Sequence, residues 1–142
     1  MTYVVGFDGT NLSEAALQRA TAFAELNDER LVVVSVLPMD ADLAADYGLI
    51  DGDEYDPEAA AHRLEERANE IAPEAEFRVE SVDAYAGKGR IATEIREVAR
   101  ETNADLVFVG SDNAGRIIQP ISSVGGSVAS AKSYDVFIVR SS

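Results

Sequence analysis

Short apolar runs alternate with amphipathic segments along most of the chain. The apolar runs are rich in Val, Ile and Phe, are bounded by turn-forming residues and predict β-strands. They span residues 3–7, 31–37, 77–82, 106–109 and 136–139. The run at 31–37 is almost entirely apolar, which is typical of a central parallel strand covered on both faces.

Between these runs, apolar residues recur three or four positions apart, which predicts amphipathic helices. Such stripes occupy residues 12–24, 59–71, 91–99 and 121–131. Pro57 precedes the second stripe and Pro73 follows it, in agreement with the usual places of proline at helix ends.

Five strands that alternate with about four helices predict a single α/β domain over residues 1–142, doubly wound around a mostly parallel sheet. Right-handed crossovers favour the strand order 3-2-1-4-5. This order opens a crevice at the carboxyl ends of the first and fourth strands. Asp8 directly follows the first strand and Gly110 directly follows the fourth, so we expect both at the crevice.

The charge balance is strongly acidic. Asp and Glu number 26 against 12 Lys and Arg, which gives a formal net charge of −14. Binding to a phosphate backbone requires a basic patch, and the chain has no run of cations, so we expect no nucleic-acid partner. The acidic, lysine-poor composition is similar to that of proteins from salt-accumulating halophiles, in which molar salt screens self-repulsion.

Residue types and segments that the sequence lacks exclude further classes of function. The chain contains no cysteine, which excludes disulfides, thiolate catalysis and cysteine metal sites. No apolar run approaches the ~20 residues of a membrane span, and the first residues lack the cationic start of a signal peptide. We therefore expect a cytoplasmic protein without a membrane partner.

Glycines and one arginine gather after the fourth strand. Backbone N–H groups near a helix start attract phosphate oxygens, and glycines allow close approach of a ligand. A hydroxyl donor and a cation in the same region would add to such a site. The residues concerned are Gly110, Gly115, Arg116, Gly126, Ser127 and Val128. Close packing of a helix through Gly125 and Gly126 explains part of the same pattern.

The chain resembles the universal stress protein family over nearly its whole length. Residues 4–17 (VVGFDGTNLSEAAL) are similar to the first strand of the family, its Asp-Gly-Ser/Thr turn and its first helix. Residues 104–111 (ADLVFVGS) are similar to its Ala-Asp-Leu-Ile-Val-Met-Gly-Ser signature. Gly126, Ser127 and Val128 match the Gly-Ser-Val that opens its last helix.

This resemblance implies a small regulatory protein that binds ATP, accompanied by Mg²⁺, rather than an enzyme. It places the adenosine against Asp8 and the backbone of Val36, and the phosphates against Gly115, Gly126 and Ser127. The implied nucleotide site comprises Asp8, Gly9, Thr10, Val36, Gly110, Gly115, Arg116, Gly126, Ser127 and Val128. We predict no catalytic residue and no metal ligand from the chain, and at most slow ATP hydrolysis.

The glycine spacing departs from the ATP-binding pattern Gly-x2-Gly-x9-Gly-Ser/Thr. The chain has Asn113 and Ser123 where that pattern has glycines, and its own glycines at 115 and 126 make a longer loop. An alternative is therefore a dimeric interaction module of the same fold without ATP. A phosphoacceptor domain is a third possibility, but the last strand is not followed by the lysine that its chemistry requires.

The closing strand favours self-association. In the order 3-2-1-4-5, the segment from Tyr134 to Arg140 lies at a sheet edge, and its centre is apolar without a charge or proline. Such an edge exposes unpaired backbone groups and invites another chain. Antiparallel pairing with a two-fold mate predicts a homodimer, which the resemblance also implies.

Overall fold

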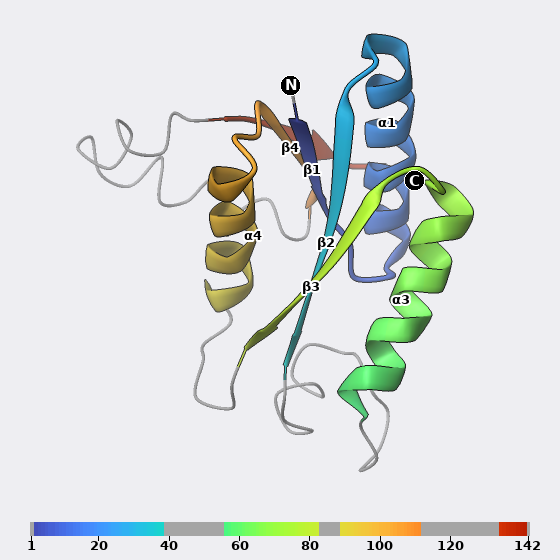
Figure 1. Cartoon of the computed structure of the whole chain (residues 1–142), viewed down its shortest axis with the longest axis vertical. Coiled ribbons are helices and arrows are strands. Elements are labelled where there is room, and N and C mark those ends of the chain that lie inside the picture. Colours follow the sequence, from blue (N-terminus) through green and yellow to red (C-terminus); the bar gives the residue numbers. More distant parts are fainter. Residues whose placement is uncertain (1, 39–55, 83–88, 112–133, 142) are drawn as a thin grey trace, which may run out of the picture.

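The structure, a computed structural model, describes residues 2–38, 56–82, 89–111 and 134–141 (Figure 1). In chain order its elements are β1 (Thr2–Gly6), α1 (Asn11–Asn27), β2 (Arg30–Pro38), α3 (Pro57–Ile71), β3 (Glu76–Val82), α4 (Gly89–Glu101), β4 (Leu106–Gly110) and β5 (Asp135–Val139). The five predicted strands and the first three predicted helices are thus confirmed. The helix predicted at 121–131 lies outside the described residues.

The five strands form one sheet in the order β3-β2-β1-β4-β5, and every neighbouring pair is parallel. The predicted order and the parallel character are therefore confirmed. Val4 of β1 lies at the centre, paired with Val32 of β2 on one side and Val107 of β4 on the other. Because all strands run in the same direction, their carboxyl ends lie at the same end of the sheet.

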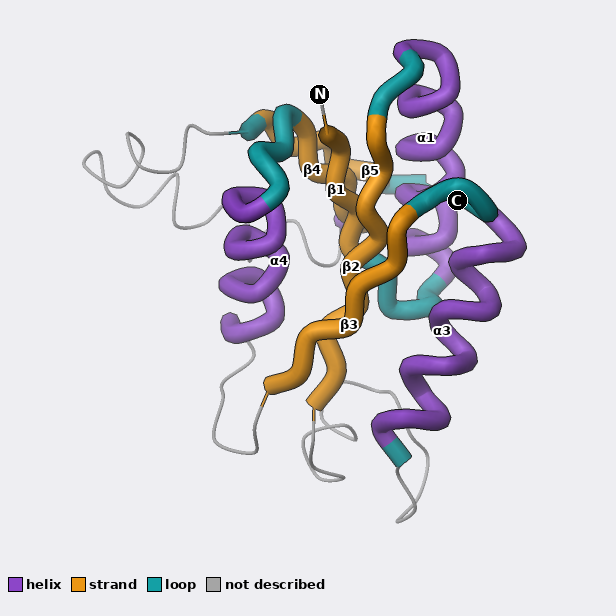
Figure 2. Tube along the Cα trace, in the orientation of Figure 1, coloured by secondary structure: helices purple, strands orange, loops and turns teal. Residues whose placement is uncertain are grey.

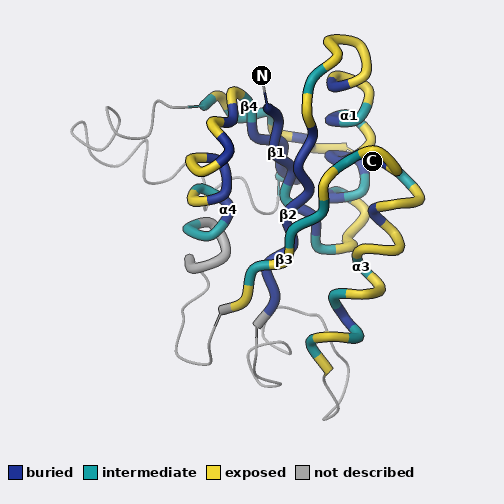
Figure 3. The backbone as a smooth tube through the Cα atoms, in the orientation of Figure 1, coloured by how far each residue is buried: buried dark blue, intermediate teal, exposed yellow. Residues whose placement is uncertain are grey.

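Helices cover both faces of the sheet (Figures 1 and 2). α4 lies on one face, where it packs on Val4, Val32 and Val107. α1 and α3 lie on the other face, over a cluster that includes Val5 and Phe108. Alternate residues of one strand thus enter opposite halves of the core, as the period of a β-strand requires. Figure 3 shows buried backbone concentrated on the inner strands.

Local sequence signals set the helix ends. The side chain of Thr10 caps α1 by accepting the Ser13 N–H, and Asp56 caps α3 by accepting the Glu58 N–H. Pro57 occupies the start of α3, where its missing N–H costs no helical hydrogen bond. α1 ends at Asn27, and its C-cap residue Asp28 adopts the left-handed conformation with φ 55°. None of the helices in the described ranges is long and apolar enough to cross a membrane.

An aromatic cluster fixes β5 to the rest of the domain. The ring centroids of Phe108 and Phe137 lie 5.1 Å apart, and Phe23 of α1 lies 5.5 Å from Phe137 and 5.7 Å from Phe108. Offset and edge-to-face ring contacts at these separations are favourable. The side chain of Phe137 therefore belongs to the core, whereas Ile138, the next residue of this edge strand, is 38% exposed.

Candidate functional site

The turn between β1 and α1 places Asp8, Gly9 and Thr10 at the carboxyl end of β1. Oδ1 of Asp8 accepts hydrogen bonds from the Thr10 N–H at 3.0 Å and from the Thr10 hydroxyl at 2.6 Å. Oγ1 of Thr10 in turn accepts the Ser13 N–H at 3.3 Å. The carboxylate therefore holds the residue that caps the helix.

This arrangement corrects one expectation about Asp8. The sequence offers both Thr10 and Asn11 as caps for the first helix, and either would leave Asp8 free. Thr10 does cap α1, but it uses Asp8 as its own acceptor, because a short Asp side chain readily bonds the backbone two residues on. Within the described parts of the chain, Oδ2 of Asp8 accepts no hydrogen bond, so one oxygen is structural and the other is open to a ligand.

Gly9 is required by the same turn. Its φ is +83°, a conformation that side chains with a Cβ rarely adopt, and an added Cβ would lie 3.2 Å from Cδ2 of Leu64 in α3. Each residue of the Asp-Gly-Thr sequence therefore has a role in the turn: Asp8 accepts hydrogen bonds, Gly9 adopts the positive φ and Thr10 caps α1. Gly9 and Thr10 are exposed, and Asp8 is half-buried.

Two buried serines fix the strand that leads into this turn. The Ser35 hydroxyl in β2 donates to the Phe7 carbonyl at 2.6 Å, and the Ser13 hydroxyl accepts the Asp8 N–H at 3.3 Å. Each serine is at most 2% exposed. Sequence reasoning did not select them, although a lone serine inside the apolar run of residues 31–37 was a signal. They hold Asp8 in place from both sides.

A small cleft of about 40 Å³ lies beside this turn. Asp8 and Val36, which the sequence predicts to share a site, both line it. The other lining residues are Gly6, Phe7, Val34, Ile95 and Val109. At Gly6 an added Cβ would lie 3.1 Å from Cδ1 of Ile95, so glycine lets α4 approach β1 closely at the cleft.

The remaining predicted site residues divide into two groups. Gly110 is buried at the end of β4, where it pairs with Val139, and its neighbour Val109 lines the cleft instead. The residues predicted on the phosphate side lie outside the described residues. They are Gly115, Arg116, Gly126, Ser127 and Val128.

The cleft is lined by few polar side chains. Asp8 is the single ionisable side chain among the described lining residues, and the other walls are apolar side chains and backbone. The described residues contain no group of three or more His, Asp or Glu side chains that could hold a metal ion. This arrangement suits recognition of a ligand with an apolar face and a few hydrogen-bonding groups.

Comparison with known proteins agrees with this fold. Residues 1–140 match the universal stress protein family. A universal stress protein crystallised in complex with cAMP is 27% identical, with a TM-score of 0.55, and the match covers 100% of this chain and 98% of the other. No curated protein matches the chain in sequence.

Two further solved structures share the fold at lower identity. The universal stress protein from Archaeoglobus fulgidus in complex with dAMP is 20% identical, with a TM-score of 0.60 over 99% of this chain and 98% of that one. A protein of the family from Burkholderia pseudomallei is 19% identical, with a TM-score of 0.57 over 99% and 96% of the two chains. With the family match over residues 1–140, these likenesses lead to one conclusion: the chain belongs to the universal stress protein family.

Proposed function

We propose that this protein binds an adenine nucleotide, with ATP as the leading candidate, at the carboxyl ends of β1 and β4, and that it acts as a regulator. The observation that carries this proposal is that Asp8, in the turn after β1, and Val36 of β2 line one cleft at the predicted switch point of the sheet. The cAMP complex of a relative that is 27% identical supports the ligand class.

In this proposal, the open Oδ2 of Asp8 accepts a hydrogen bond from a ribose hydroxyl or from the adenine amino group. Oδ1 stays on Thr10 and keeps the carboxylate oriented before the ligand arrives. Val36 contributes backbone groups to the adenine edge. Its position allows this, because β1 and β2 pair only as far as Gly6 and Val34, two residues before Val36.

The cleft volume of about 40 Å³ is far below the roughly 300–1,000 Å³ of a usual small-molecule site, so the cleft marks one end of the proposed site. The phosphates would lie against Gly115, Gly126 and Ser127, with Arg116 as a neutralising cation. Mg²⁺ would arrive with the phosphates, since it is usually bound through substrate phosphates and retained waters rather than by a cage of protein ligands. We assign no hydrolytic step to the chain, because Asp8 is the single ionisable side chain among the described residues of the cleft and the proposal uses it to bind the nucleotide.

Asp8→Asn tests the proposed contact. Asn keeps an oxygen acceptor for Thr10 but replaces the open oxygen with an NH₂ group, which cannot accept a hydrogen bond. Loss of one hydrogen bond to a neutral ligand group costs about 0.5–1.5 kcal/mol, so we expect roughly two- to tenfold weaker ATP binding by calorimetry.

Asp105→Asn is the matched control. Asp105 lies at the amino end of β4, where its Oδ2 accepts the Thr2 N–H at 3.3 Å. The same chemical change there alters the net charge equally but lies at the opposite end of the sheet. Equal affinities of wild type, Asp8→Asn and Asp105→Asn for ATP would show that Asp8 does not contact the nucleotide. A failure of all three proteins to bind ATP would contradict ATP binding itself.

A second candidate function is a dimeric interaction module of the same fold that binds no nucleotide. The observation that favours it is the edge position of β5, which carries the exposed Ile138. Equilibrium binding of labelled ATP in molar salt separates the two functions, because only the first predicts saturable binding.

A further inference from the structure

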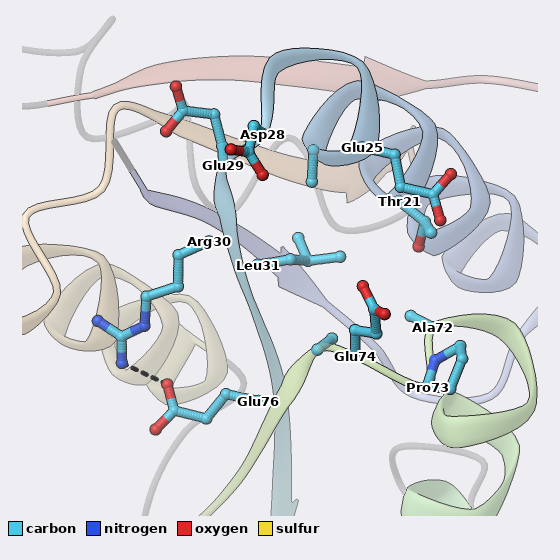
Figure 4. A pocket seen from close by; sticks show the side chains of 12 residues that line it. Thr21, Glu25, Asp28, Glu29, Arg30, Leu31, Ala72, Pro73, Glu74 and Glu76 are labelled. Atoms are coloured by element: carbon cyan, nitrogen blue, oxygen red, sulfur yellow. Dashed lines mark hydrogen bonds and ion pairs between the residues drawn. The ribbon is translucent and has the colours of Figure 1, made fainter.

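A larger groove, of about 600 Å³, lies at the opposite end of the sheet from the Asp8 cleft. It is framed by the end of α1, the first residues of β2 and the turn between α3 and β3 (Figure 4). Its volume falls within the range of about 300–1,000 Å³ that is usual for small-molecule sites. Nothing in the proposed nucleotide function uses it.

The floor of the groove is apolar. Leu31 lies in its middle, between the end of α1 and the Pro73–Glu74 turn (Figure 4). Ala24 and Ala72 complete the floor from α1 and from the end of α3, and all three side chains are less than 10% exposed. This surface is suited to contact with methylene groups rather than with a hydrated ion.

The rim of the groove is acidic. It carries five carboxylates and one cation, Arg30, which is ion-paired with Glu76. Glu25, Asp28 and Glu74 form no ion pair with any described residue. The carboxylate of Glu74 points over the floor toward Leu31 (Figure 4). The groove therefore combines an apolar floor with uncompensated negative charge.

Two helix ends add to that negative charge. The C-cap residues of α1 and α3, Asp28 and Ala72, both line the groove. A helix C-terminus carries a partial negative charge, which proteins often offset with Lys or Arg in the last turn. Neither α1 nor α3 has a basic residue there. Both helices therefore favour a cation in the same place.

We propose that this groove binds a small alkyl amine with two or more ammonium groups. Its methylene chain would cover Leu31, Ala24 and Ala72, and its ammonium groups would pair with Glu25 and Glu74. A bare metal ion fits less well, because the described residues hold no cluster of three metal-ligating side chains and the floor offers a metal no ligand.

Hexamethylenediamine is the probe, measured by calorimetry at an ionic strength of about 0.1 M, where the screening length is ~10 Å. The variant E25Q/E74Q removes two rim charges from exposed positions and retains the shape of the groove. Exposed ion pairs contribute about 0.2–1 kcal/mol each, so we expect binding to weaken about fivefold. The control E65Q/E97Q removes two exposed charges outside the groove and should bind like wild type.

Two comparison ligands separate a specific site from general attraction to an acidic protein. Mg²⁺ carries the same double charge as the probe without a methylene chain, and ethylenediamine has a shorter methylene chain, so both should bind more weakly. Equal binding of all three, equal losses in E25Q/E74Q and E65Q/E97Q, or no binding of the probe would overturn the proposal. Tighter binding of a lysine tetrapeptide, also weakened by E25Q/E74Q, would assign the groove to a basic protein segment instead.

Discussion

The Oδ1 atom of Asp8 accepts both the backbone N–H and the hydroxyl of Thr10, at 3.0 and 2.6 Å. Thr10 caps α1, so the carboxylate at the end of β1 also organises the start of the helix that packs on it. A residue proposed to contact a nucleotide is therefore already ordered without one. Its removal must affect stability as well as binding.

Asp8→Ala should lower the free energy of unfolding by about 1 kcal/mol, because the Thr10 donors lose their acceptor and the cap loses its support. Asp8→Asn keeps an oxygen at the same place and should lose less. Urea unfolding of the two variants and wild type measures the difference. Equal losses for Ala and Asn would show that the hydrogen bonds to Thr10 contribute little.

The sequence predicted the strand interiors better than the strand ends. The apolar pattern marked residues 31–37 and 77–82, but the strands begin earlier, at Arg30 and Glu76. These two charged residues form an ion pair with each other across neighbouring strands. A polar pair of this kind has no period along the chain, so hydrophobic pattern alone does not detect it.

The sequence also predicted only part of the candidate site, because contacts between residues distant in the chain leave no local pattern. Strand order predicts that Asp8 and Gly110 share one end of the sheet, and the family resemblance adds Val36. Asp8 and Val36 line the observed cleft, whereas Gly110 is not among its lining residues. The bond from Ser35 to the Phe7 carbonyl joins residues 28 apart in sequence, so only the packed sheet shows it. The acidic groove at the other end joins two separate segments, residues 21–31 and 72–76, and no local motif in the sequence marks it.

Tyr134→Phe should stabilise the protein. The Tyr134 hydroxyl oxygen is buried without a hydrogen-bond partner among the residues that the structure describes, and an unsatisfied buried hydroxyl costs roughly 1 kcal/mol or more. Burial also raises the pKa of Tyr134, against a smaller opposing effect from Arg96 and Arg100. Stability linked to this phenol is therefore present below its unfolded pKa and is lost as the pH rises through the folded pKa.

Denaturant unfolding near pH 8 and near pH 10.5 tests both parts, since an unperturbed Tyr titrates near pH 10. The advantage of Tyr134→Phe over wild type should grow at the higher pH. The other tyrosines titrate in both proteins and cancel in the difference. A less stable variant at both pH values would show that the hydroxyl makes a favourable interaction.

Glu14 and Arg67 should contribute to acid sensitivity. Nη2 of Arg67 in α3 lies 2.5 Å from Oε1 of Glu14 in α1, and this hydrogen bond lowers the pKa of Glu14. Its contribution to stability is therefore present above the unfolded pKa of a glutamate and is lost as the pH falls through the lower folded value. Glu14→Gln should be less stable than wild type near neutral pH, and the difference should shrink in acid.

Thermal melts between about pH 6 and pH 3 measure this effect, a window that spans the glutamate pKa near 4.3. Glu65→Gln in α3 is the control, because Glu65 is exposed and has no ion pair with the described residues. A Glu14→Gln deficit that stays constant with pH would assign the effect to packing rather than to charge.

Stability should rise with salt concentration. The formal net charge of −14 predicts self-repulsion in the folded state, and screening shortens from ~10 Å at 0.1 M salt to ~3 Å at 1 M. Melting temperatures across a KCl series give the measurement. A flat response would mean that the carboxylates are compensated locally, as Glu76 is by Arg30.

The self-association proposed for β5 can be tested at one residue rather than two. Lys at either Phe137 or Ile138 would place a charge on this strand, but the half-buried Phe137 ring stacks on Phe108 and packs against the core, so Lys there would disrupt the fold. Ile138 is 38% exposed on the same edge strand and tolerates a charge better. Pairing of β5 with a two-fold mate would bring the introduced cations of the two chains close together.

Ile138→Lys should therefore be a monomer in molar KCl by light scattering, whereas wild type should be a dimer. Val79→Lys is the matched control, because Val79 is 40% exposed and lies on β3, the other edge strand of the sheet. It adds the same charge to a similar surface and should leave the dimer intact. A dimer that survives Ile138→Lys but dissociates with Val79→Lys would move the interface to β3, since edge strands at both ends offer unpaired backbone groups.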